Sequence, residues 1–103
     1  MNYKVCFIAH QYLYGGEEGD SELLRYCRRH GITVKKGELL LAGRLCEGIK
    51  RGDTLFMADK TPLPVKGLSA YGRTFEELEA GMTCAILTDR VDHPFYQGDL
   101  LYR

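Results

Sequence analysis

The sequence predicts a mainly β fold, a small closed antiparallel barrel of the Greek-key kind with one short inserted α-helix. Six or seven short segments of β-type composition are separated by turn signals at intervals of roughly ten residues. Glycines interrupt β-type sequence at Gly43, Gly48 and Gly52, where the chain must bend sharply or let another backbone come close. Only the segment 17–31 has helical periodicity.

Size and composition indicate one domain. The chain has 103 residues, of which 45% are hydrophobic and 27% charged, as in an ordinary soluble globular protein. We therefore expect a single barrel domain over 1–103, with the helical insertion at about 17–31. No apolar run is long enough to cross a bilayer, and the N-terminal segment lacks a small-residue cleavage site. We expect a cytoplasmic protein with no membrane partner.

The first segment is a strand. Residues 3–14, YKVCFIAHQYLY, are rich in β-branched and aromatic side chains. Val5, Phe7 and Ile8 predict burial on both faces, and Gly15-Gly16 ends the segment.

The next segment changes to a helical period. Over 17–31 acidic residues come first and arginines last, the order that the helix dipole favours. Asp20 or Ser21 can cap the N-terminus, and Gly31 follows at the C′ position. One face carries the residues expected to pack inward: Leu23, Tyr26, Cys27 and His30.

The rest of the chain predicts strands joined by turns. Residues 32–35 and 38–45 predict a hairpin with Lys36-Gly37 as its turn. Thr61 to Pro64 can only be an edge strand or a loop, because its two prolines have no backbone N–H group to donate to a neighbouring strand. The remaining expectations are a strand at 55–58, a strand at 65–71, a central strand at 82–88, a loop at 91–97 and a closing strand at 99–102. Residues 76–79 could nucleate one helical turn, but the segment is too short to persist alone as a helix.

No group of residues indicates a reaction centre. The cysteines Cys6, Cys27, Cys46 and Cys84 have no metal-binding spacing, and we expect reduced, buried thiols, although an even count also permits disulfides. Cys27 lies one helical turn from His30, so a Cys-His nucleophile is conceivable, but a cysteine packing inward is far commoner. The sequence predicts no catalytic residue, no cofactor and no metal, and so no enzyme.

Charge is unevenly distributed although the net charge is zero. Between Arg25 and Arg51 eight basic residues face two acids, and between Glu76 and Asp99 six acids face one arginine. Such a molecule can steer an anionic partner to one face, or pair with copies of itself. A solvated surface of mixed charge explains any single cluster equally well.

A series of short motifs follows in order along the chain: Gly43-Arg44-Leu45, Lys50-Arg51-Gly52-Asp53, the strand 65–70, Ala80-Gly81-Met82 and Gly98-Asp99-Leu100. Their order and spacing resemble the second domain of translational GTPases such as elongation factor Tu. The resemblance covers about two thirds of the chain, 32–102. It implies a free-standing barrel of that type. The residues that it implies to be structural turns are Gly43, Gly48, Gly52, Asp53, Gly81, Gly98 and Asp99.

The chain departs from this family in three respects. It has no phosphate-binding loop, because Gly15-Gly16 and Gly19 lack the lysine and hydroxyl that the loop needs. The family barrel helps to hold the acceptor end of aminoacyl-tRNA with an acidic residue at the position that Ser69 occupies here. The segment 15–31 looks like an insertion between the first two strands.

The basic residues are the best candidates for binding, because such side chains beside tyrosines suit phosphates and bases. We expect a non-catalytic module that binds RNA, the ribosome or an RNA-associated protein. The alternative is a protein-interaction or self-association module, in which the basic helix meets the acidic 76–79 region. The candidate binding residues are Arg25, Arg28, Arg29, Lys35, Lys36, Arg44, Lys50, Arg51 and Tyr71.

Overall fold

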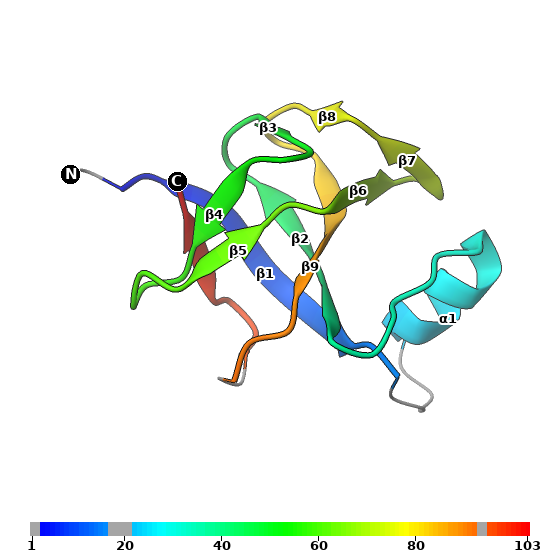
Figure 1. Cartoon of the computed structure of the whole chain (residues 1–103). Helices are drawn as coiled ribbons and strands as arrows, with labels where there is room; N and C mark the ends of the chain where they lie inside the picture. The colour runs from blue at the N-terminus through cyan, green and yellow to red at the C-terminus, as the bar shows by residue number, and fades with distance from the viewer. Residues whose placement is uncertain (1–2, 17–21, 93–94) are drawn as a thin grey trace.

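The computed structural model describes residues 3–16, 22–92 and 95–103 as a mainly β, antiparallel fold with one helix at its side (Figure 1). The elements are β1 (Val5–Tyr14), α1 (Glu22–His30), β2 (Glu38–Leu45), β3 (Ile49–Lys50), β4 (Thr54–Phe56), β5 (Pro62–Pro64), β6 (Gly67–Ala70), β7 (Arg73–Phe75), β8 (Glu77–Leu78), β9 (Thr83–Asp89) and β10 (Leu100–Tyr102).

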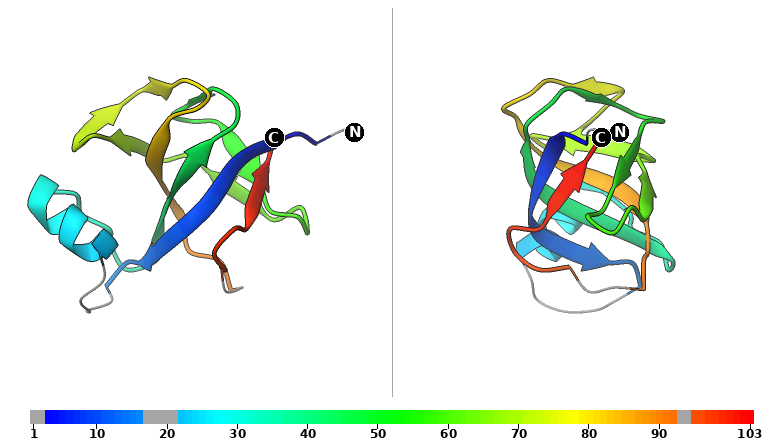
Figure 2. Two further views of the ribbon diagram at one scale, coloured as in Figure 1. Left: turned by 180° about the vertical axis from the view of Figure 1, so that it is seen from behind. Right: turned by 90° about the vertical axis from the view of Figure 1, so that its left-hand side faces the viewer.

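Eight strands form one antiparallel sheet in the order β5-β4-β10-β1-β2-β9-β6-β7, and β3 pairs with β8 separately. The apolar strand β9 lies between β2 and β6, which is the central place that its sequence predicts. The proline-containing strand β5 pairs only with β4, as an edge strand would. Figure 2 shows the sheet curling around the core, with α1 outside it.

The chain changes its bonding partner between β5 and β6. The Val65 amide donates to the Asp53 carbonyl at 2.8 Å, beside β4, whereas the Lys66 amide donates to the Leu87 carbonyl of β9 at 2.8 Å. One extended stretch therefore bonds to β4 through its first half and to β9 through its second.

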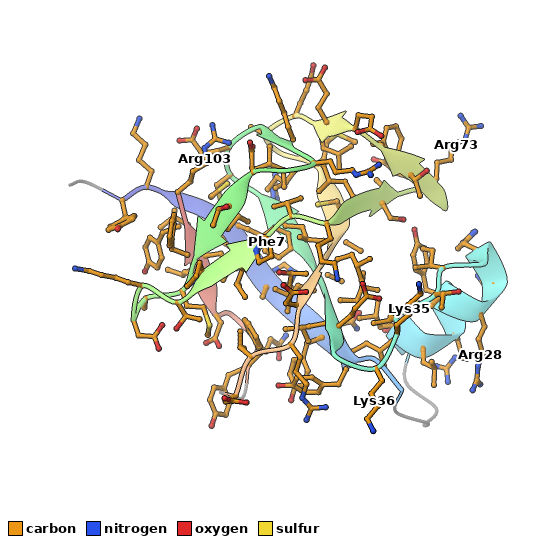
Figure 3. All side chains as sticks on the ribbon, viewed as in Figure 1. Phe7, Arg28, Lys35, Lys36, Arg73 and Arg103 are labelled. Carbon is orange, nitrogen blue, oxygen red and sulfur yellow. The ribbon has the colours of Figure 1, made fainter. Side chains whose placement is uncertain are left out.

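The inner face of the sheet holds the main hydrophobic core. Its largest side chains are at most 2% exposed, and Phe7 of β1 lies near the centre (Figure 3). Alternate residues of the strands supply the core because side chains of a strand alternate between its faces. Phe7 is surrounded by core residues that include Leu39, Leu41, Leu45, Leu55, Leu63, Ile86, Phe95 and Leu101.

Two turns with the same bonding pattern explain the repeated Gly-Asp-x-Leu sequence. The Asp53 carboxylate accepts from the Lys50 amide, and the Asp99 carboxylate accepts from the Tyr96 amide, each at 2.9 Å. The glycine before each aspartate has a left-handed backbone, with φ +97° at Gly52 and +92° at Gly98. Each turn thus needs a glycine for its φ angle and an aspartate for its side-chain hydrogen bond.

The helix α1 ends as its sequence predicts. Gly31 has φ +68°, and the Ile32 amide donates to the Cys27 carbonyl at 2.9 Å, the long bond of a Schellman motif. The candidate caps Asp20 and Ser21 lie outside the described residues.

One expectation for secondary structure is wrong. Residues 32–35 form no strand, because β2 already pairs with β1 on one edge and with β9 on the other. Ile32 and Val34 instead pack against the helix-side cluster. The segment 76–79, which is too short for a persistent helix, instead contributes Glu77 and Leu78 to β8, which pairs with β3.

The expectation of buried thiols holds for three of the four cysteines. Cys6, Cys27 and Cys84 are buried and free, whereas Cys46 is exposed. Cys46 directly follows the last residue of β2, the buried Leu45.

Candidate binding groove

The helix α1 covers only part of the outer face of the sheet. Leu23 and Cys27 of the helix pack against Leu40 of β2 and Ala85 of β9. Beside this contact, outer positions of β2, β9 and β6 carry the short side chains of Ala42, Thr83 and Ser69, which do not project far from the sheet.

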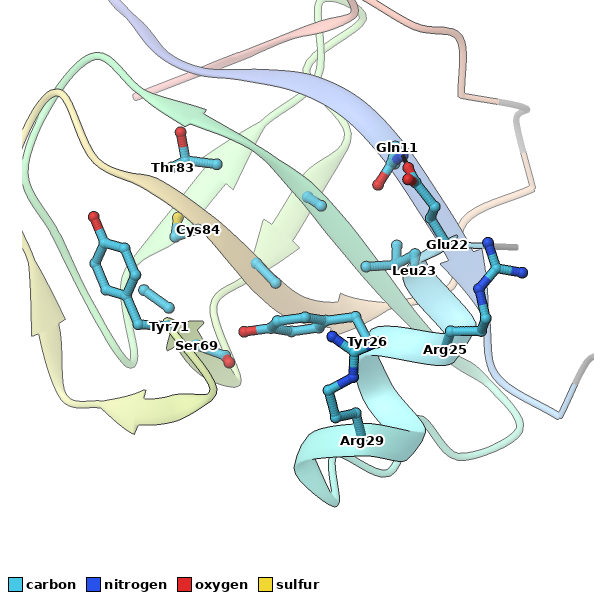
Figure 4. Close-up of a pocket in the computed structure, with 13 residues that line it drawn as sticks. Gln11, Glu22, Leu23, Arg25, Tyr26, Arg29, Ser69, Tyr71, Thr83 and Cys84 are labelled. Atoms are coloured by element: carbon cyan, nitrogen blue, oxygen red, sulfur yellow. Dashed lines mark hydrogen bonds between the residues drawn. The ribbon is translucent and has the colours of Figure 1, made fainter. Parts of the chain in front are cut away.

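A groove of about 530 Å³ lies between the helix and the β6–β7 turn (Figure 4). Its volume falls within the range of small-molecule sites. The helix contributes one wall, the Tyr71 turn the other and the small outer residues the floor. The lining includes Gln11, Glu22, Leu23, Arg25, Tyr26, Arg29, Ala42, Ser69, Tyr71, Thr83 and Ala85.

The helix is tied to the β6–β7 turn at one end of this groove. The Gly72 amide donates to the Tyr26 hydroxyl at 2.9 Å. The His30 ring lies against the Tyr26 ring, with centroids 4.6 Å apart. A Cβ atom at Gly72 would come within 2.4 Å of His30 Nδ1, so only glycine allows this close contact. We name Tyr26, His30 and Gly72 the helix latch.

Ser69 has a buried hydroxyl without a partner. The residue is 6% exposed, and its Oγ forms no hydrogen bond with any described group. Most buried side-chain polar atoms in folded proteins have a partner, so this hydroxyl is an exception that needs an explanation. Ser69 is part of the groove lining, but its Oγ atom has less than 1 Å² of exposed surface.

Tyr71 is held in a left-handed backbone conformation at the tip of a two-residue turn. Its φ is +53° and that of Gly72 is +74°, the signs that a type I′ hairpin turn requires. Such a φ costs a residue other than glycine about 1 kcal/mol, and asparagine or glycine is the usual choice. The Tyr71 side chain is 80% exposed, so burial of the ring does not offset this cost.

The structure divides the predicted binding residues into separate groups. Arg25, Arg29 and Tyr71 line the groove. Arg28 lies on the outer side of the helix, and Lys35 and Lys36 lie in the following loop (Figure 3). Arg44 is exposed on β2, where it pairs with Thr83 of the groove lining.

Lys50 and Arg51 do not join these residues. They lie at β3 and the turn after it, away from α1 (Figure 1). Lys50 lies opposite Glu77 of β8, and Arg51 forms an ion pair with Glu76 at 3.1 Å.

The amino-acid sequence contains only a weak signal for the groove. Ser69 is a polar residue between apolar neighbours, which indicates an outward-facing strand position but not a pocket. The small floor residues Ala42 and Ala85 carry no signal at all, because only the pairing of β2 with β9 makes them neighbours.

The thiols and histidines form no reactive pair in the part of the chain that the structure describes. Burial raises the pKa of Cys27, which disfavours the nucleophilic thiolate, and the His30 ring lies on Tyr26. Burial also raises the pKa of Cys6 to about 11 and that of Cys84 to about 12. No group of three potential metal ligands occurs among the described side chains.

Within the described ranges, the model contains no helix of the length and apolar character needed to span a membrane. Comparisons of the chain with protein-family models, with curated proteins and with solved structures gave no match.

Proposed function

We propose that this chain is a non-catalytic module that binds RNA, free or within the ribosome, through a basic surface formed by α1 and the loop after it. The basic surface consists of Arg25, Arg28, Arg29, Lys35 and Lys36. We further propose that the fold is a closed barrel of the type found in the second domain of translational GTPases. The stretch that bonds to both β4 and β9 supports closure, because it would link the two ends of the curled sheet.

The distribution of ion pairs carries the proposal. The ion pairs that join two described residues involve other cations: Arg51 with Glu76, Lys66 with Glu38 and Asp89, and Arg103 with Asp53. None of these pairs includes Arg28, Arg29 or Lys36, each of which is exposed. The positive charges of these three side chains are therefore not balanced by any of those ion pairs, and such positive charge attracts phosphates.

The same ion pairs weaken the alternative of an acidic docking region at 76–79. Glu76 already has Arg51 as its partner, and Glu77 lies opposite Lys50. A second copy of the chain would have to compete with these local cations for the acidic side chains. We therefore favour RNA over self-association.

Fluorescence anisotropy of a short labelled single-stranded RNA, titrated at several salt concentrations, tests the proposal. We expect affinity to fall steeply with salt, because each phosphate contact releases counterions. The double variant Arg28→Glu with Lys36→Glu should lose about tenfold or more in affinity. The matched control, Lys4→Glu with Lys60→Glu, reverses two exposed charges away from α1 and should bind almost as the parent chain does.

An affinity for RNA that does not change with salt would contradict binding through the basic surface. An equal loss of RNA affinity in the two double variants would contradict it as well. Light scattering of the same samples across concentration gives the second check. A chain that self-associates and does not bind RNA would favour the alternative.

A further inference from the structure

We propose that the Tyr71 ring stacks on an unpaired base of a bound RNA strand, so that the module prefers RNA with accessible bases over a bare sugar-phosphate chain. This inference rests on the proposed RNA binding and deepens it, because the basic surface accounts for contacts with phosphates but not with bases. It is supported by the exposure of the ring, by the backbone conformation of Tyr71 and by the attachment of its turn to the helix.

The Tyr71 ring is available to another molecule. Tyr71 is 80% exposed, more than any other large hydrophobic residue in the described part of the chain. Its ring takes part in none of the ring contacts between described residues. Every RNA base presents a flat face that can stack on such a ring, whatever the sequence.

The stability of the turn does not explain why position 71 carries a tyrosine. The φ of +53° is one that asparagine or glycine adopts at lower cost in a type I′ turn. Contacts of the ring within the chain do not offset this cost, because the ring is mostly exposed. A costly conformation that packing does not repay is typical of residues with a functional contact.

The helix latch places Tyr71 beside the basic helix. The Gly72 amide donates to the Tyr26 hydroxyl at 2.9 Å, so the turn is joined to α1 directly after Tyr71. Arg29 follows Tyr26 by one helical turn, and the Cβ atoms of such a pair lie about 5–6 Å apart. Tyr71 and Arg29 line the same groove from its two walls (Figure 4). A strand with one phosphate at Arg29 would therefore have a base near Tyr71.

The charge beside the ring favours a nucleic acid over an apolar peptide. Arg29 is exposed, and it belongs to none of the ion pairs that join two described residues. An apolar peptide could cover the Tyr71 ring but would leave this guanidinium without a counter-charge. An RNA strand supplies a base for the ring and a phosphate for the guanidinium, the combination that single-strand binding sites use.

The experiment titrates the full chain with two fluorescently labelled RNA oligomers of equal length. One is oligoadenylate, and the other is an abasic oligomer with the same number of phosphates. We expect the parent chain to bind oligoadenylate about tenfold more tightly, because only this oligomer can stack. Equal affinities for the two oligomers would overturn the base contact and leave RNA binding through the basic surface intact. Failure to bind either oligomer would overturn both proposals.

The variant Tyr71→Asn tests the ring, with melting temperature measured alongside. We expect it to bind oligoadenylate about tenfold more weakly, to bind the abasic oligomer as the parent does, and to melt at the same or a higher temperature. The matched control is Tyr96→Asn, because Tyr96 is 65% exposed but does not line the groove. Unchanged binding of oligoadenylate by Tyr71→Asn, or an equal loss in the control, would contradict the assignment.

The variant Tyr71→Trp detects the stacking itself. The chain contains no tryptophan, so the fluorescence of this variant comes from position 71 without interference from another indole. We expect Tyr71→Trp to keep the affinity for oligoadenylate, and its fluorescence to be quenched by oligoadenylate but not by the abasic oligomer. A complex with oligoadenylate in which the fluorescence is not quenched would contradict stacking.

The two proposals can fail separately. The variant Arg28→Glu with Lys36→Glu should weaken binding of both oligomers by a similar factor, because it removes phosphate contacts and leaves Tyr71 in place. Tyr71→Asn should instead remove the difference between the oligomers. If the charge reversal weakens neither oligomer but Tyr71→Asn weakens oligoadenylate, the basic surface is refuted and the base contact stands.

Discussion

At the scale of single residues, Gly43 shows how closely two strands approach in this fold. A Cβ atom at this position would lie 1.9 Å from the Ile8 carbonyl oxygen and 2.9 Å from Phe7 Cζ. The pairing of β1 with β2 shifts register nearby, between Ala9 and Gln11. The absence of a side chain at Gly43 therefore allows the two strands to pair around an irregularity, as bulges often require.

Replacing Gly43 tests this contact. Gly43→Ala should destabilise the chain by about 3 kcal/mol or more, since a backbone carbonyl cannot move away as a flexible side chain can. Urea denaturation followed by circular dichroism gives the free energy of unfolding.

Gly48→Ala is the matched control for this substitution. An added Cβ there would meet its nearest atom, the Leu78 carbonyl oxygen, at an ordinary 3.5 Å. We expect a change below about 1 kcal/mol. A comparable loss of stability in both variants would show that the close approach of the strands is not the reason why position 43 requires glycine.

At the scale of elements, α1 is attached to the sheet by few contacts. Its packing depends on Leu23 and Cys27, which form a cluster separate from the main core. Further contacts include the hydrogen bond from Gln11 of β1 to Glu22 and the helix latch, in which the Gly72 amide donates to the Tyr26 hydroxyl. A helix of nine residues is marginal by itself, so these contacts stabilise it.

Removing the Leu23 side chain should therefore unfold α1 without unfolding the sheet. Leu23→Ala is expected to cost the docked helix about 2 kcal/mol or more, which corresponds to roughly a 30-fold loss of amide protection. Hydrogen exchange measured by NMR should show this loss in α1, while β2 and β9 keep their protection.

The exposed Arg28 provides the control on the same helix. Arg28→Ala should leave amide protection in α1 nearly unchanged, because the side chain is exposed. Equal loss of protection in α1 and in the sheet after Leu23→Ala would contradict separate attachment and would indicate a single cooperative unit.

At the scale of the whole molecule, the curled sheet encloses one core and leaves its charges unevenly balanced at the surface. Phe95 and Leu101, near the C-terminal end, share the core with Phe7. Unfolding of the sheet must therefore expose side chains from both ends of the chain together.

The cysteines report this global opening. Only Cys46 is exposed, while Cys6, Cys27 and Cys84 are buried with raised pKa values. With an aromatic disulfide reagent, we expect one thiol to react quickly in the native chain and the rest only as the structure opens. Four should react at once in denaturant.

A Cys46→Ser variant is the control for the thiol assay, and it should show no fast phase. Cys27 should react sooner than Cys6 and Cys84, because it lies under the weakly attached helix. Rapid reaction of all four thiols in the native chain would contradict a core that opens only as a unit.

Features that depend only on neighbouring residues follow from the amino-acid sequence alone. The helix with its Gly31 ending, the β-type composition of the strands, the turns at Gly52 and Gly98 and the edge strand with two prolines all follow from local backbone preferences. Such preferences act over a few residues, so they can be read without knowing the rest of the fold.

The choice of which segments lie side by side depends on the folded chain as a whole. Residues 32–35 have strand-like composition, but both edges of β2 are already paired, and Glu77 and Leu78 pair with the distant strand β3. The groove needs Ala42, Ser69 and Ala85 on adjacent strands beside Tyr26 of the helix, and these residues are far apart in the chain. Strand pairing is a long-range choice among competing edges, and no local pattern of residues specifies it.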